Sequence, residues 1–151
     1  FDETLFAHME EIDYHWKCQL LGYEVWVEPK SVIYHHGAIT LPISSPKKTY
    51  LNYRNSLILL LTNYPIPISF KLFFPRFFME ILSLIKEILF FRWNHAFAIV
   101  KAWFYTFFHP GLLYRRRLSL VKTHKINNIY SKSIVIGYYL LGKKTFAKLI
   151  N

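Results

Sequence analysis

The stretch from Phe70 to Phe91 constrains the fold most, because its polar residues recur at helical spacing. Five of them follow one another at steps of five, four, three and four, and are Lys71, Arg76, Glu80, Ser83 and Glu87. Such steps place polar side chains on one stripe of a helix, whose remaining surface is Leu, Ile and Phe. A helix of this kind needs an apolar cover, either from other helices or from a membrane interface.

Charge is divided unevenly along the 151 residues, whose formal net charge is +10. Residues 1–63 carry seven acids and five bases, whereas residues 64–151 carry two acids and fourteen bases. An acidic head and a basic, aromatic tail suggest two tasks. The basic tail has the charge to meet nucleic acid, anionic lipid or a phosphorylated substrate.

Composition excludes several classes of protein. A chain that is 53% hydrophobic and 19% aromatic is not disordered. Its single cysteine, Cys18, excludes a disulfide framework and a cysteine-based zinc site. The chain begins at Phe1, without the pattern of a signal peptide, and we expect it to be a fragment.

The first 65 residues alternate between helical and strand-like patterns. Apolar residues recur at helical spacing over Glu10–Leu21, and two strand-like runs follow at Glu24–Glu28 and Ser31–His35. A loop over Gly37–Pro46 leads to a helix over Lys47–Asn63, stopped by the prolines that follow it. The pattern predicts an α/β unit.

The tail has apolar helices but no obvious membrane span. A further helix is predicted over His95–Phe108, before Pro110. The longest uncharged runs, Asn55–Phe70 and Ala102–Tyr114, are interrupted by proline, and a span needs about 20 apolar residues. Aromatic and basic residues favour contact with the membrane interface. The alternative is that these helices pack on one another as an ordinary helical core.

Three carboxylates, Glu10, Glu11 and Asp13, lie at the start of the first predicted helix. An acidic first turn that complements the helix dipole explains this spacing without any function. The functional interpretation is a carboxylate general base, which removes a proton from an acceptor hydroxyl as that oxygen attacks.

Several segments in order resemble bacterial family-2 inverting glycosyltransferases, of the GT-A, rhamnosyltransferase-like type. They are Phe1-Asp2-Glu3 followed by Glu10-Glu11-Ile12-Asp13 and Trp16-Lys17, then Gly22 to Pro29, Val32-Ile33-Tyr34-His35 and Tyr53-Arg54-Asn55. The resemblance implies that residues 1–65 are the acceptor-side, C-terminal half of a GT-A (nucleotide-diphospho-sugar transferase) domain. It implies that residues 66–151 are a basic, aromatic, amphipathic helical extension that associates with membranes.

The resemblance also implies roles for single residues. Glu11 stands at the position of the catalytic base, Glu10 would hold the acceptor or the loop, and Asp13 matches the second, more structural acid. Trp16 is either core packing or a wall of the acceptor site. Lys17 stands where arginine is usual, and a point charge does not replace the guanidinium fork.

Three further residues are candidates for ligand contact. Arg54 would neutralise a phosphate or pair with an acid of the motif, and Asn55 beside it would contact acceptor or donor; an ordinary helix-surface arginine is the alternative. His35 would lie near the donor diphosphate or its metal ion, although a histidine after a strand also has ordinary structural roles.

The function implied is transfer of a sugar, with inversion, from a nucleotide-diphospho-sugar to a hydroxyl of a lipid-linked or other cell-surface glycan. The family's Asp-x-Asp pair is not in this sequence, so a divalent cation, Mg²⁺ or Mn²⁺, would be held mostly by a missing N-terminal half. We expect this fragment alone to be inactive and the intact parent to act at the cytoplasmic face of the bacterial inner membrane, as a peripheral protein. The alternative is a non-catalytic module that binds a membrane surface or nucleic acid; no nucleic-acid motif is present, so nucleic acid is not an expected partner.

Overall fold

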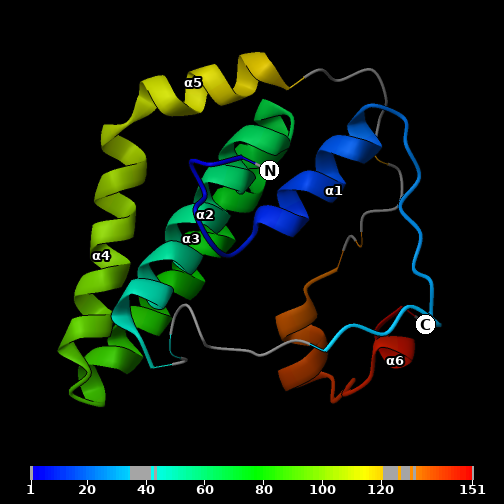
Figure 1. Cartoon of the computed structure of the whole chain (residues 1–151). Coiled ribbons are helices and arrows are strands. Elements are labelled where there is room, and N and C mark those ends of the chain that lie inside the picture. The colour runs from blue at the N-terminus through cyan, green and yellow to red at the C-terminus, as the bar shows by residue number, and fades with distance from the viewer. Residues whose placement is uncertain are drawn as a thin grey trace.

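The described part of the computed structural model, residues 2–34, 42, 44–120, 126, 130 and 132–150, is helical. Its elements are α1 (Glu10–Leu20), α2 (Pro46–Asn63), α3 (Ile66–Leu89), α4 (Trp93–Phe108), α5 (Pro110–Ser119), the π-helical η1 (Ile136–Leu140) and α6 (Phe146–Ile150). In Figure 1, α2 and α3 run side by side through the centre and α4 follows one edge. Helix α5 crosses one end, α1 lies on the other side of α2, and α6 stands apart.

The prediction of an α/β fold is wrong, and with it the prediction that residues 1–65 are half of a GT-A domain. Residues 24–28 and 31–34 are extended but join no sheet within the described ranges, and His35 lies outside them. Their apolar side chains stay in solvent, with Trp26 84% and Ile33 85% exposed. Side chains that favour strands are not sufficient, because a strand also needs a neighbouring strand to pair with. No such strand lies beside these two segments in the described structure.

The helix predictions are confirmed to within a few residues. Helix α1 ends at Leu20, and Gly22 adopts a left-handed φ of 87° just beyond it, as expected of a terminating glycine. Helix α2 begins at Pro46 and α4 at Trp93. Helix α3 begins at Ile66, earlier than the polar spacing indicates, because Pro67 is tolerated in a first turn, where its missing N–H needs no partner.

The core lies between α2 and α4. Leu57, Ile58 and Ile99 are fully buried there, and Ala102 is as well. Small side chains on α4 let its backbone approach α2 closely. Helix α2 also contacts α1, α3 and α5, so it connects the acidic head to the basic tail. The predicted division at residue 65 falls between α2 and α3 and stays a prediction.

Helix α3 is oriented with its polar stripe inward. Ser69 and Glu80 are each only 2% exposed. Arg76 pairs with Glu80 over 2.6 Å and donates to Ser56 of α2 over 2.6 Å, while Trp103 of α4 donates to Glu80 over 2.5 Å. Lys71, the first residue of the predicted stripe, is exposed instead.

Candidate functional site

The loop before α1 has an unusual backbone. Phe6, His8 and Met9 have positive φ values of 62°, 68° and 71°. For residues other than glycine, such left-handed conformations cost on the order of 1–2 kcal/mol each. Three of them in four residues persist only where surrounding contacts hold them, a situation frequent at functional sites. Met9 precedes α1 directly, so this loop fixes where the acidic first turn of the helix begins.

Asn55 supplies most of the contacts that hold the loop. Its Nδ2 lies 2.8 Å from the carbonyl oxygens of Leu5, Ala7 and His8, and its side chain is fully buried. The neighbouring Arg54 donates to the carbonyl oxygens of Thr4 and Leu5, at 2.9 and 3.0 Å, and to Asn55 Oδ1 at 2.9 Å. These two side chains are therefore used by the loop, and their predicted contact with acceptor or donor stays a prediction.

Asp13 is the buried member of the acidic motif, with 1% exposure. Its carboxylate accepts from Arg116 Nη2 of α5 at 2.9 Å and from Asn63 Nδ2 of α2 at 3.0 Å, and pairs with Lys17 Nζ at 2.6 Å. Asp2 joins the same group by pairing with Lys17 and Arg116. We call Asp2, Asp13, Lys17 and Arg116 the four-charge cluster. It ties the loop, α1 and α5 together.

The environment of Asp2 favours its charged form. Burial by itself would raise the pKa of the Asp2 carboxyl, but hydrogen bonds from Thr4 and the positive charges of Arg116 and Lys17 together hold that pKa below its ordinary value. The carboxylate therefore stays ionised at neutral pH, as the cluster requires.

Glu11 differs from Asp13 in its surroundings. It lies in the first turn of α1, is exposed, and makes no side-chain hydrogen bond or ion pair with any described residue. Glu10 is half-buried, and its Oε2 is buried with no hydrogen-bond partner among the described side chains and backbone. The acidic motif thus separates into a structural carboxylate, Asp13, an exposed carboxylate, Glu11, and a half-buried one, Glu10.

Trp16 lines a pocket of about 370 Å³ beside the acidic turn. Its ring meets the ring of Tyr64 edge to face, with centroids 4.6 Å apart, and Met9 and Ile12 lie in the same wall. Arg76 of α3 lines the pocket as well. Trp16 is therefore half-buried and reaches a concave surface, which leaves both of its predicted roles open.

Residues for a metal ion are not gathered in the described ranges. No group of three or more His, Cys, Asp or Glu side chains there is placed to hold one. His35, the predicted ligand, lies outside the described residues, as does His36. The expected divalent cation stays a prediction.

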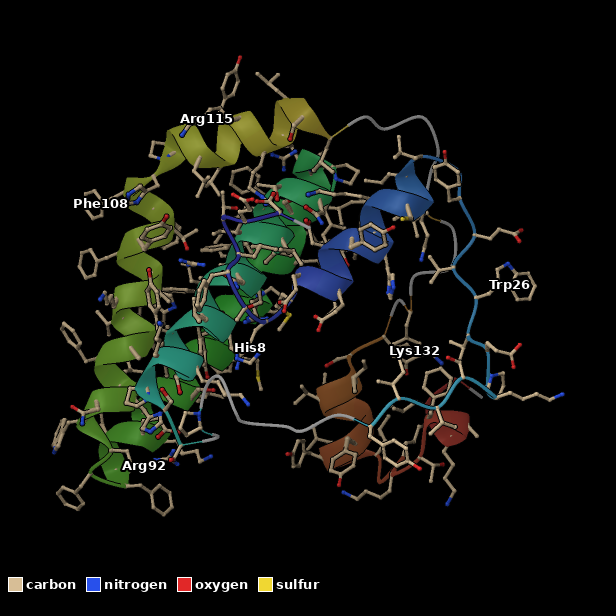
Figure 2. All side chains as sticks on the ribbon, viewed as in Figure 1. His8, Trp26, Arg92, Phe108, Arg115 and Lys132 are labelled. Carbon is tan, nitrogen blue, oxygen red and sulfur yellow. The ribbon has the colours of Figure 1, made fainter. Side chains whose placement is uncertain are left out.

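Two helix faces expose large apolar side chains. We call them the α3 face, made of Phe70, Phe74, Phe78, Leu82, Ile85 and Leu89, and the α4 face, made of Trp93, Phe97, Phe104 and Phe108. Every one of these side chains is at least 45% exposed. Figure 2 shows Phe108 pointing away from the bundle. No described helix is long and apolar enough to cross a membrane.

Sequence reasoning missed the part that α5 plays. Arg116 is buried and reaches two acids of the head, but in the sequence it is one of three consecutive arginines, Arg115 to Arg117. The sequence did contain one signal, the excess of acids in residues 1–63. When such acids are buried, their charge must be paired with basic side chains from elsewhere in the chain. Nothing local distinguishes Arg116 from its neighbours.

The comparisons with known proteins add no relative. No protein-family model, curated protein or solved structure matches this chain.

Proposed function

We propose that this chain is the acceptor-side, membrane-docking part of a glycosyltransferase. It would help move a sugar from a nucleotide-diphospho-sugar to a hydroxyl of a lipid-linked or other cell-surface glycan, with inversion, at the cytoplasmic face of a bacterial inner membrane. The observation that carries the catalytic part is the placement of Glu11. This carboxylate is solvent-accessible and unpaired among the described residues, on a helix whose start is held by the buried Asn55.

The described residues contain no sheet, so the fold gives no support to this function. The support comes from the placement of the Glu11 side chain and from the order of the segments that resemble the glycosyltransferases. Precise placement matters for a general base, because it must lie within hydrogen-bond reach of the hydroxyl that it deprotonates. The strained loop provides that precision at the cost of unfavourable backbone conformations. An ordinary acidic first turn needs no such support.

In the reaction, a Glu11 oxygen takes the proton of the acceptor hydroxyl. The resulting oxygen attacks the anomeric carbon of the donor sugar as the bond between that carbon and the diphosphate oxygen breaks. One displacement inverts the configuration at that carbon. A bound divalent cation would neutralise charge on the departing diphosphate. The described residues do not form a site for it, so we assign it no ligand in these ranges.

The α3 face supports the membrane part of the proposal. An ordinary surface helix turns its polar side to water, whereas α3 buries Ser69 and Glu80 of its polar side and exposes Phe74 and Phe78, by 67% and 59%. A contiguous exposed apolar surface indicates contact with a partner or a lipid. Basic residues near it, such as Lys71 and Lys86, favour an anionic bilayer surface.

The catalytic proposal is tested by Glu11→Gln in the full-length enzyme that the proposal implies, assayed with a panel of nucleotide sugars and a cell-envelope glycan fraction. We expect a loss of kcat of at least about a hundredfold with little change in KM, because the amide cannot accept the proton. Glu3→Gln, an exposed acid outside the acidic first turn of α1, is the matched control. Turnover like that of wild type in Glu11→Gln would remove Glu11 from the mechanism.

The membrane proposal is tested by flotation of the chain with phospholipid vesicles. Replacing Phe74 and Phe78 by serine should lower the bound fraction by about tenfold or more, since each ring contributes a large apolar area. Exchanging Trp26 and Tyr34 of the extended segment, which are even more exposed, for serine is the control. An equal loss in both variants, or no loss in either, would contradict docking through the α3 face.

A further inference from the structure

A pocket of about 320 Å³ lies between the N-terminal halves of α2 and α4. Lys47 and Tyr50 line it from α2, and Asn94, Phe97 and Lys101 line it from α4. We call this the lysine pocket. It is separate from the acidic turn and from the pocket beside Trp16, with which it shares no lining residue.

The two lysines have aromatic partners and no acidic ones. Lys47 Nζ lies 4.8 Å from the ring centroid of Phe6, and Lys101 Nζ lies 5.3 Å from that of Tyr50. Neither ammonium pairs with a carboxylate in the described structure, and no Asp or Glu lines the pocket. A ring face holds an ammonium in place without neutralising its charge. Two positioned, uncompensated ammonium groups in one pocket fit an anion.

The position of the pocket indicates which anion. Phe97 lines the pocket and also belongs to the α4 face, where it is 69% exposed. When an aromatic side chain enters the upper acyl region of a bilayer, lysines beside it lie at the level of the lipid phosphates. The charge and the adjoining apolar face therefore suit one and the same molecule, a phospholipid.

We propose that the lysine pocket binds the phosphate of an anionic phospholipid, with Lys47 and Lys101 as its cationic ligands. Asn94 lies in the wall, where its amide can donate to a phosphate oxygen. Phe97 covers the glycerol end of the same lipid from the α4 face. This inference rests on the proposed membrane docking, and it adds a specific headgroup site to a surface that would otherwise bind lipid through apolar area alone.

The test measures binding of the whole chain to vesicles of phosphatidylcholine, with and without about 30% phosphatidylglycerol. Wild type should bind the anionic vesicles more tightly. Lys47→Gln/Lys101→Gln should lose roughly tenfold in affinity for them and keep its affinity for neutral vesicles. Lys30→Gln/Lys132→Gln removes the same charge from exposed positions that do not line the pocket and should change binding by less than about threefold; Figure 2 shows Lys132 beside η1.

Each outcome is decisive. An equal loss in both double variants would show diffuse attraction and overturn the site, as would binding of glycerol phosphate at about 10 mM without any preference for phosphatidylglycerol vesicles, which would assign the pocket to free phosphate. If the chain binds neutral vesicles and its affinity does not increase with phosphatidylglycerol, the site is overturned while membrane docking is left intact. Failure to bind either vesicle would overturn docking and the site together. Lys47→Arg/Lys101→Arg, which keeps both charges, should bind like wild type, and circular dichroism verifies the folding of all variants.

Discussion

Trp103 of α4 donates its indole hydrogen to Glu80 of α3, with Nε1 and Oε2 2.5 Å apart. The same carboxylate pairs with Arg76, and it is 2% exposed. A buried carboxylate is stable only where donors satisfy it. The contact between Trp103 and Glu80 therefore fixes which side of α3 faces the bundle, and the apolar α3 face follows from it.

Replacing Glu80 by glutamine should destabilise the fold by roughly 2 kcal/mol, because the ion pair with Arg76 is lost in a buried setting. Chemical denaturation would measure the change. Glu87→Gln is the control on the same helix; its partner Arg92 has a half-exposed side chain, so the cost should stay under about 1 kcal/mol. Equal costs for the two variants would contradict a dominant role for Glu80.

Arg116→Lys should lower stability by about 2 kcal/mol, since a single ammonium cannot reproduce the guanidinium contacts with both Asp2 and Asp13. Arg115→Lys should cost less than about 0.5 kcal/mol, because Arg115 is exposed. Figure 2 shows Arg115 on the outer side of α5. Thermal unfolding of the two variants would compare their stabilities directly. An Arg116→Lys variant as stable as wild type would mean that α5 is held by its other contacts.

Asn55→Ala should cost roughly 3 kcal/mol, because buried carbonyl groups of the loop lose their donor. Asn52→Ala, on the same helix and without a side-chain hydrogen bond in the described structure, should be nearly neutral. Hydrogen exchange of the amides in residues 3–10 gives a local readout. Unchanged exchange in Asn55→Ala would mean that Arg54 alone suffices to hold the loop.

The four-charge cluster predicts a dependence of stability on pH. The pKa of Asp2 is lower in the folded state than its ordinary value of 3.8, so its contribution is present above that pH. It is lost as the pH falls through the lower, folded-state pKa. The difference in unfolding free energy between wild type and Asp2→Asn should therefore be largest at neutral pH and shrink below about pH 3.8. A difference that stays constant from pH 2 to 7 would exclude a role for the Asp2 charge.

The helices could be predicted because their signals are local. Gly22 ends α1 and Pro65 separates α2 from α3 through backbone restrictions that depend on one or two residues. The prediction of strands was wrong at the segment that contains Trp26 and Ile33. A segment becomes a strand only when another strand pairs with it, and its own composition does not show whether such a partner is present.

The candidate site could be predicted only in part. The sequence pointed to Glu10, Glu11 and Asp13, but spacing alone did not separate the exposed acid from the buried one. That separation depends on Arg116, about a hundred residues away in the chain, and on Asn63. The side to which the polar stripe of α3 points also depends on residues far away in the sequence. A polar stripe is a periodic signal, but whether it faces water or other helices depends on partners such as Trp103.

The inward stripe of α3 has a consequence for how the protein would enter and leave a bilayer. Because its polar pairs are completed inside the bundle, none must be broken when Phe74 and Phe78 pass from water into lipid. Insertion then requires no refolding, only the exchange of one solvent for another around a rigid surface. In water that same surface would favour self-association, so we expect solutions of the chain to need detergent or lipid to remain monodisperse.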